Sequence, residues 1–272
     1  MALRNPAFSN NPAFQPGKAA QTAEAGGVAT AEQLQQLYDA PAATAVDTDR
    51  MTYEDTAIKT VFLFVVLLAG AAVGWFVPAL AIIGAIAGLA LGLVNSFKRN
   101  PSAPLILLYG AAEGLFIGGI SRVFESVPNW GGVVLQAVMA TLVVFGVTLA
   151  LFASGKIRAS KKLTKVFLIA MIGYAVFALI NVGLMIFGGV DSNLAFGLYS
   201  VKVFGGIPLG VIIGVLAVLM AAYSLVLDFD FIQQGVRNRA PRKMGWYGAF
   251  GLMVTLVWLY IEFLRLFAVA RD

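Results

Sequence analysis

Two apolar stretches decide the fold of this chain: LVLDFD from Leu225 to Asp230, and WLYIEF from Trp258 to Phe263, joined by a basic connection from Arg237 to Lys243. Each stretch carries carboxylates where a membrane-spanning helix should carry none. A charge at the centre of a bilayer costs about 2.5–3.5 kcal/mol on insertion scales, so such residues indicate function by default. We therefore interpret the rest of the chain as the frame that holds these carboxylates.

The composition of the chain makes lipid its solvent. Of its 272 residues, 60% are hydrophobic and only 12% are charged, whereas soluble domains carry about 25% charged residues. A lipid bilayer is therefore the first predicted partner. The chain contains neither Cys nor His, which excludes disulfides, the usual zinc sites, haem ligation through His and Ser-His catalysis. No cofactor is predicted.

Apolar segments of membrane length fill the chain after its first fifty residues. Thr52 and Asp55 form an N-cap signature that should open the first helix, and Pro78 should separate the first two spans in a tight hairpin. Each segment approaches the roughly 20 residues needed to cross about 30 Å of hydrocarbon. The sequence predicts an all-α integral membrane protein with a seven-helix bundle over 52–272, and with spans at about 60–77, 79–97, 104–123, 131–153, 166–187, 204–231 and 246–269.

Residues 1–51 read as a disordered tail that precedes the bundle. They are rich in Ala, Gln, Asn, Pro and Thr and bury little apolar surface. No apolar stretch of a signal peptide follows the start. The tail repeats Asn-Pro-Ala-Phe at 5–8 and 11–14. We interpret the repeat as two turns, with a docking motif for an unknown protein partner as the alternative.

The distribution of basic residues predicts the orientation. The second, fourth and sixth connections carry eleven Lys and Arg, whereas the other three carry only Arg122 and Lys202. Cytoplasmic loops collect Lys and Arg, so we expect a plasma-membrane protein with a cytoplasmic N-terminus and its C-terminus outside. Because the positive charge lies between apolar spans, it indicates topology and not a nucleic-acid site.

Glycines recur every four residues inside several spans. Such small-xxx-small ladders let helices approach closely, and we interpret them as packing positions, with a glycine-lined pore as the alternative. The ladders are Gly84, Gly88 and Gly92; Gly110, Gly114 and Gly118; and Gly206, Gly210 and Gly214.

The candidate site consists of the few ionisable residues inside spans: Glu113, Asp228, Asp230, Glu262 and Arg265. Carboxylates that lie close together in a site without water cannot all be ionised, so a bound proton or cation must neutralise part of their negative charge. Oxygen ligands without His or Cys suit hard cations such as Ca²⁺. Asp228 and Glu262 differ by about 10 Å in level if both helices stand upright, so a tilt or kink is needed to bring them together.

Each candidate has a plainer interpretation. Glu262 can simply pair with Arg265 at i+3, and Asp230 can lie hydrated at the cytoplasmic interface. Glu113 has no basic residue within one helical turn, so no local pair explains it. Catalysis is disfavoured, because the chain lacks the Gly-x-Gly-Asp motif of intramembrane aspartyl proteases and has no Lys after Lys243 for a retinal Schiff base.

At these positions the sequence resembles the Bax inhibitor family. The string at 259–267, Leu-Tyr-Ile-Glu-Phe-Leu-x-Leu-Phe, is similar to the family's Leu-Tyr-Leu-Asp-Phe-Ile-x-Leu-Phe. The end of span six at 225–233 and Glu-Gly-Leu at 113–115 also resemble family positions. The Asn-Pro-x-Phe opening and the Lys-Thr at 59–60 are similar to a bacterial branch with a long N-terminal tail. The resemblance covers about residues 52–270.

The resemblance implies a bundle with the last helix central and a pH-gated Ca²⁺ leak. In such a leak, two acids on spans six and seven, which match Asp228 and Glu262, form a hydrogen bond when protonated and separate when ionised. This chain departs from the family pattern in having Glu at the second acid, Arg265 in place of a neutral residue, and a longer connection between the spans.

The sequence leaves two hypotheses about function. The first is a pH-sensitive leak channel or exchanger for a cation, calcium foremost, gated by protons on Asp228 and Glu262 with Glu113 nearby. The second is a non-transporting scaffold or stress regulator that binds a protein partner through its tail.

Overall fold

A computed structural model describes residue 35, residues 49–189, residue 191 and residues 194–271. The predicted tail therefore lies outside the described residues, apart from residue 35 and residues 49–51, and its disorder stays a prediction. The chain divides into two units between Thr48 and Asp49. All the membrane-length helices belong to the second unit.

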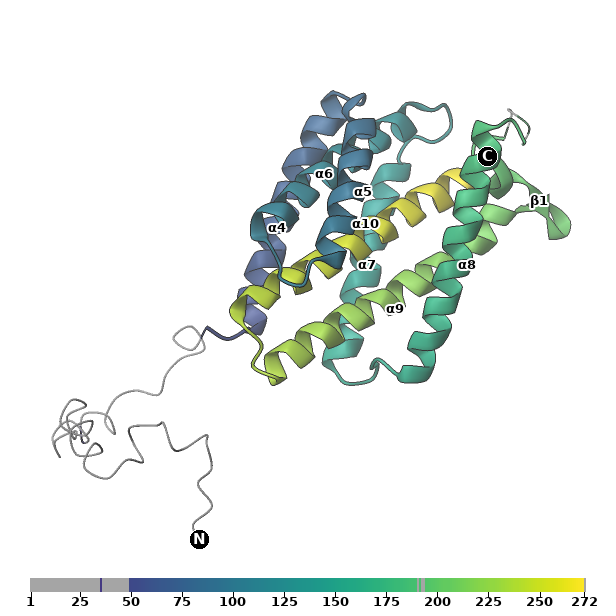
Figure 1. The fold of residues 1–272 in the computed structure, drawn as a ribbon. Helices are drawn as coiled ribbons and strands as arrows, with labels where there is room; N and C mark the ends of the chain where they lie inside the picture. The colour runs from purple at the N-terminus through teal and green to yellow at the C-terminus, as the bar shows by residue number, and fades with distance from the viewer. Residues whose placement is uncertain (1–34, 36–48, 190, 192–193, 272) are drawn as a thin grey trace, which may run out of the picture. The chain divides into compact units, whose positions relative to one another are not determined.

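The described residues form seven helices that are long and apolar enough to cross a membrane, which confirms the predicted fold class. Two short strands and three 3₁₀ turns complete the secondary structure described here (Figure 1). The membrane-length helices are α4 (Tyr53–Phe76), α5 (Leu80–Phe97), α6 (Ala103–Ser126), α7 (Val133–Ala153), α8 (Lys161–Ile186), α9 (Leu209–Arg237) and α10 (Gly245–Val269).

The first helical hairpin follows the predicted signals. The backbone amide of Asp55 donates to Oγ1 of Thr52 at 3.1 Å, which satisfies one of the free N–H groups at the start of α4. Pro78 stands between α4 and α5, and its carbonyl accepts from Ala81 in the first turn of α5 at 3.0 Å. A proline here ends one helix without breaking a hydrogen bond of the next.

The sixth span begins later than predicted. Residues 204–208 were expected to be helical, but β1 (Lys202–Val203) pairs with β2 (Ile207–Pro208) in an antiparallel hairpin. Gly205 and Gly206 have φ angles of 78° and 98°, a conformation that glycine adopts at little cost. Gly206 therefore does not belong to the predicted ladder, and α9 instead continues past residue 231 to Arg237.

The glycine ladder of α6 is a packing surface. A Cβ atom at Gly114 would overlap the carbonyl of Leu67, and one at Gly118 would overlap the carbonyl of Ala71. Both carbonyls belong to α4, so α4 and α6 lie backbone to backbone. Gly84 of α5 faces the other side of α6 in the same way. These glycines have the packing role that we predicted for the ladders.

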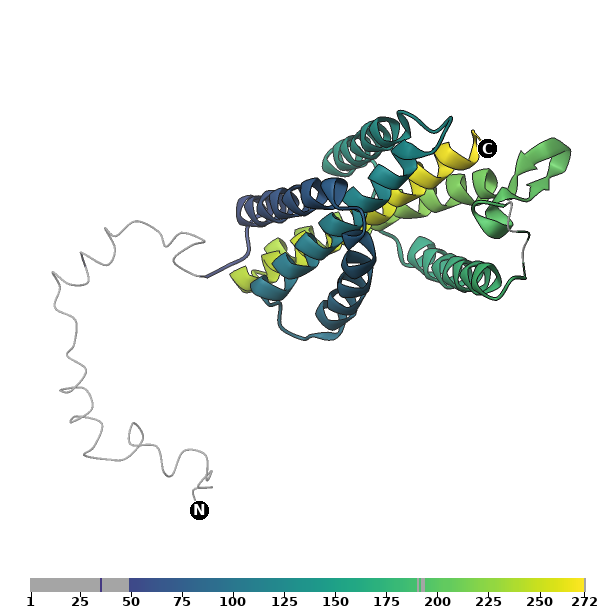
Figure 2. The same ribbon diagram turned by 90° about the horizontal axis from the view of Figure 1, so that it is seen from above.

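Helix α10 is the central helix, as the family resemblance implied. It contacts α4, α6, α7 and α9. In its most apolar stretch of 18 residues, 56% of the residues are buried, compared with 6% in the corresponding stretch of α8. Helix α8 lies on the far side of α9 and α10 from α4 and α5 (Figures 1 and 2). The buried side chains of α10 are therefore shielded by the neighbouring helices, and α8 lies on one side of α10 only.

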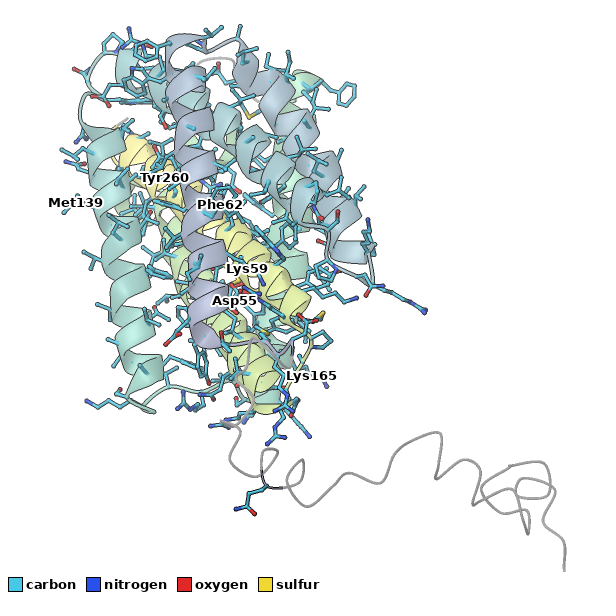
Figure 3. The ribbon with its side chains drawn as sticks, turned by 90° about the vertical axis from the view of Figure 1, so that its left-hand side faces the viewer. Asp55, Lys59, Phe62, Met139, Lys165 and Tyr260 are labelled. Carbon is cyan, nitrogen blue, oxygen red and sulfur yellow. The ribbon has the colours of Figure 1, made fainter. Side chains whose placement is uncertain are left out.

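The connections rich in Lys and Arg lie together at one end of the bundle, which we call the basic end; the other end is the opposite end (Figure 1). Here the α9–α10 connection is fastened to α4 (Figure 3). Asp55 forms ion pairs with Lys59 and with Arg242, the latter at 2.8 Å. Met51, only 2% exposed, donates its backbone N–H to Ala240 at 2.8 Å. The start of α10 is thereby fixed in position.

Candidate functional site

Four polar side chains follow one face of α10. Their spacing of three, four and three residues keeps them on one side of a helix, and this side faces α9 and α8. We call this face the polar stripe; it consists of Thr255, Trp258, Glu262 and Arg265.

Glu262 is the most enclosed member of the polar stripe, with 1% of its surface exposed. Its Oε2 forms an ion pair with Nη2 of Arg265. Its Oε1 accepts from the hydroxyl of Tyr174 on α8 and from the indole N–H of Trp258, the latter at 3.1 Å. Several donors thus surround the carboxylate, which is the condition under which a buried ion pair is tolerated. The predicted alternative, an i+3 pair, is confirmed.

Arg265 is held by two tyrosine rings in addition to its ion pair. Its Nη1 donates to the hydroxyl of Tyr174 at 3.2 Å. Its guanidinium carbon lies 4.0 Å from the ring centroid of Tyr199, a residue of the short turn η2 (Gly197–Ser200). Cation–π contact with Tyr contributes more where water is excluded. Nε of Arg265 and the hydroxyl of Tyr199 are buried without a partner among the described residues.

Asp228 has a different environment. It is half-buried on α9, and its Oδ2 accepts from the hydroxyl of Thr255 at 2.6 Å. The oxygen of Thr255 in turn lies 3.1 Å from Oγ of Ser224. The described residues place no Lys or Arg within ion-pair distance of this carboxylate. Among the described residues, Asp228 is therefore held by the hydroxyl of Thr255, without a compensating charge.

The two acids lie at different levels of the polar stripe. Thr255, which binds Asp228, precedes Glu262 by seven residues, or about 10 Å at helical rise. This separation equals the difference in level predicted from the sequence. Each acid has its own hydrogen-bond partners, and no hydrogen bond between Asp228 and Glu262 occurs among those of the described residues. In this structure the two acids are therefore separate from each other.

The remaining predicted site residues lie elsewhere. A Cβ at Gly88 of α5 would be 2.6 Å from Oε1 of Glu113, so this acid packs between α5 and α6 and outside the polar stripe. Asp230 is half-buried on α9 and accepts from Nε2 of Gln234 at 2.5 Å. In the described part of the chain, no three acidic side chains gather to hold a metal ion.

The polar stripe has partners that the sequence did not single out as site members. Tyr174 and Tyr199 come from other elements, and only packing brings them to α10. Thr255 could have been found, because it lies two turns before Glu262 on the same face and near the level of Asp228. The polar stripe thus treats the two acids differently. Glu262 is neutralised by Arg265, whereas Asp228 has no positive partner and could accept a proton or bind a cation.

A family model described as Bax inhibitor 1 like matches residues 5–272. The match covers nearly the whole chain. No curated protein matches this chain.

Proposed function

Because the chain belongs to the Bax inhibitor 1-like family of multi-pass membrane proteins, we propose that it conducts cations, calcium foremost, across the bilayer as a pH-sensitive leak or exchanger. The gate is the carboxylate pair Asp228 and Glu262 at the polar stripe. The protein is not an enzyme, and protons and calcium are its transported or sensed ions.

The observation that carries this proposal is the uncompensated carboxylate on α9. Asp228 lies in a membrane-length helix, and its hydrogen-bond partner is the hydroxyl of Thr255. An ionised carboxylate at such a position requires a counter-charge, and a passing cation or a proton would supply it. Carboxylate and hydroxyl oxygens are also ligands that Ca²⁺ accepts. Asp228 therefore has the chemistry of a gate that a proton closes and a cation occupies.

The proposed topology places the basic end in the cytoplasm. The plasma membrane is the proposed location, with the N-terminus inside and the C-terminus outside, on the basis of the Lys and Arg count of the connections. Arg122 and Lys202 would then be among the few basic side chains on the outer side.

The test is Ca²⁺ efflux from liposomes that contain the purified full-length protein, measured at acidic and at neutral pH. We expect a pH-dependent efflux for the unaltered protein and an efflux without pH dependence for Asp228→Asn. The matched control is Asp230→Asn, which removes the same charge from a half-buried position of the same helix that lies outside the polar stripe and accepts from Gln234. It should leave both the efflux and its pH dependence unchanged.

Tight vesicles at every pH would refute the transport proposal, as would an Asp228→Asn variant that behaves like the unaltered protein. A loss of pH dependence in both aspartate variants would also count against a gate at Asp228, because it would show a general effect of charge on α9.

The scaffold hypothesis has one observation in its favour. Glu262 is already compensated by Arg265. A structural role in helix packing is therefore enough to explain this buried acid, and no ion transport is needed. The proposed partner would bind the tail. Removal of residues 1–48, which keeps the packed residues Arg50 and Met51, separates the two functions: a scaffold loses its co-purifying partner, whereas a channel keeps its efflux.

A further inference from the structure

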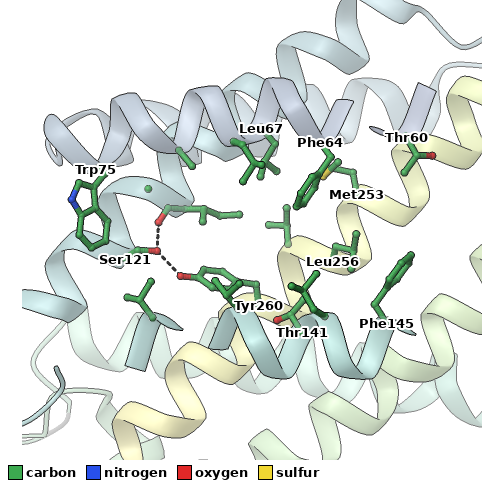
Figure 4. A pocket seen from close by; sticks show the side chains of 18 of the residues that line it. Thr60, Phe64, Leu67, Trp75, Ser121, Thr141, Phe145, Met253, Leu256 and Tyr260 are labelled. Atoms are coloured by element: carbon green, nitrogen blue, oxygen red, sulfur yellow. Dashed lines mark hydrogen bonds between the residues drawn. The ribbon is translucent and has the colours of Figure 1, made fainter. Parts of the chain in front are cut away.

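A groove of about 440 Å³ runs between α4 and α7 (Figure 4). Helix α8 lies on the other side of α10 (Figure 2). We call it the α4–α7 groove. Helices α6 and α10 form its floor, with Ile117 and Leu256 among the floor residues. The volume is within the range of about 300–1,000 Å³ that is usual for small-molecule sites.

The groove opens sideways between its two walls. Val61 on α4 and Leu142 on α7 line it and are 63% and 51% exposed. Both residues lie within membrane-length helices, so the mouth faces hydrocarbon. Along α7 the groove extends from Val134 to Phe145, about 16 Å at helical rise, which is close to the roughly 15 Å depth of one leaflet.

The hydroxyl groups that line the groove already have partners in the protein. The hydroxyls of Ser121 and Tyr260 lie 2.6 Å apart, and that of Ser121 also donates to the carbonyl of Ile117 at 2.6 Å. The hydroxyls of Thr141 and Thr60 donate to carbonyls of their own helices. A polar ligand would find few free partners here, whereas apolar cavities accept apolar occupants. The lining therefore fits a hydrocarbon chain.

A cationic group stands where the groove reaches the opposite end. Trp75 lines the groove there, and the guanidinium carbon of Arg122 lies 5.6 Å from the centroid of its indole ring. Arg122 is exposed, and no carboxylate of the described residues lies within ion-pair distance of it. Trp and Arg both suit the membrane interface, and Arg binds phosphate through two parallel hydrogen bonds.

We propose that the α4–α7 groove is a binding site for an anionic phospholipid. One acyl chain lies along the groove, and the phosphate is held at Arg122 beside Trp75. This site is separate from the polar stripe, because the stripe faces α8 and α9 whereas the groove lies between α4 and α7.

The test uses phosphatidylglycerol with a photoreactive diazirine in its acyl chain, present at a low fraction in phosphatidylcholine vesicles that contain the full-length protein. After illumination, peptide mass spectrometry locates the adducts. We expect them to concentrate on the groove-lining residues of α4 and α7. Val138→Trp places an indole in the groove and should remove most of these adducts. Leu135→Trp, an exposed position of α7 outside the lining, should not.

The headgroup is tested by comparing the labelling by phosphatidylglycerol with that by phosphatidylcholine when each carries the same photoreactive acyl chain. Arg122→Gln should lower the preference for phosphatidylglycerol by roughly fivefold, the contribution of one cation near an anionic headgroup. Lys202→Gln, which removes another basic group outside the groove, should leave the preference unchanged. Because Arg122 is exposed, this variant is expected to fold even if Val138→Trp does not.

Three results would overturn the proposal: adducts spread evenly over all lipid-facing helices, adducts that persist in Val138→Trp, or equal labelling by both lipids in the unaltered protein. None of them depends on Ca²⁺ efflux, so failure here leaves the transport proposal standing.

Discussion

Replacement of Glu262 by Gln should destabilise the bundle by about 3 kcal/mol. Removal of one partner from a buried ion pair costs about 3–5 kcal/mol, because the other charge stays buried without compensation. Glu262 is 1% exposed and the side chain of Arg265 is 14% exposed, so water screens the remaining guanidinium poorly. Gln keeps an oxygen that can accept from Tyr174 and Trp258, which puts the expected loss at the low end of the range.

The measurement is a double-mutant cycle. The free energy of unfolding is obtained from SDS titration of mixed micelles, followed by circular dichroism, for Glu262→Gln, Arg265→Met and the double variant. The double variant removes both charges, so its free energy of unfolding should be at least as high as that of the less stable single variant. The coupling energy should be about 2–3 kcal/mol. Asp230→Asn, at a position outside the ion pair and the polar stripe, should change the stability by no more than about 0.5 kcal/mol.

The reasoning would be refuted by a Glu262→Gln variant within about 0.5 kcal/mol of the unaltered protein, since the pair would then contribute as little as a surface ion pair. Strict additivity of the two single substitutions would refute it as well, because it would show that the two charges do not interact.

Three further substitutions test neighbouring contacts. Tyr174→Phe removes a hydrogen bond to the charged Glu262 and should lower the unfolding free energy by about 1.5–3 kcal/mol in the same titration. Thr255→Val removes the hydroxyl that donates to Asp228 and contacts Ser224 on α9, and it should cost about 1–3 kcal/mol; a neutral result would contradict these contacts. Gly118→Val drives a side chain into the backbone of α4 and should cost about 1–3 kcal/mol or more, whereas Gly146→Val enters open space and should be close to neutral.

The membrane helices could be predicted from sequence because length and apolar composition are local properties. The ion pair of Glu262 with Arg265 could also be anticipated, since both residues lie on one helix three positions apart. The donor from Tyr174 could not, because it depends on how α8 packs against α10. Glu113 shows the same limit: its level in the membrane follows from the sequence, but the helix rotation that turns it to Gly88 on α5 does not.

The start of α9 was predicted wrongly for a related reason. Residues 204–208 contain apolar side chains and directly precede the apolar span. The average hydropathy of the region therefore does not separate them from the helix. Two consecutive glycines with a proline two positions further on favour a turn instead, and the positive φ angles of Gly205 and Gly206 let the chain reverse into a hairpin. At this position the turn preference of the glycines decides where the helix begins, and the average hydropathy does not.

The two acids at the polar stripe are held so differently that they cannot respond equally to a proton. A proton on Glu262 would have to displace the ion pair with Arg265 and the hydrogen bond from Tyr174. A proton on Asp228 requires only that the hydroxyls of Thr255 and Ser224 turn: that of Thr255 would then accept from the carboxyl group and donate to Ser224, whose oxygen lies 3.1 Å away. Within the proposed function, Asp228 is thus the acid that senses pH, and Glu262 fastens α8 to α10 beside it. On this division of roles, Asp228→Asn should abolish the pH dependence of Ca²⁺ efflux without a large loss of stability, whereas Glu262→Gln should lower stability first.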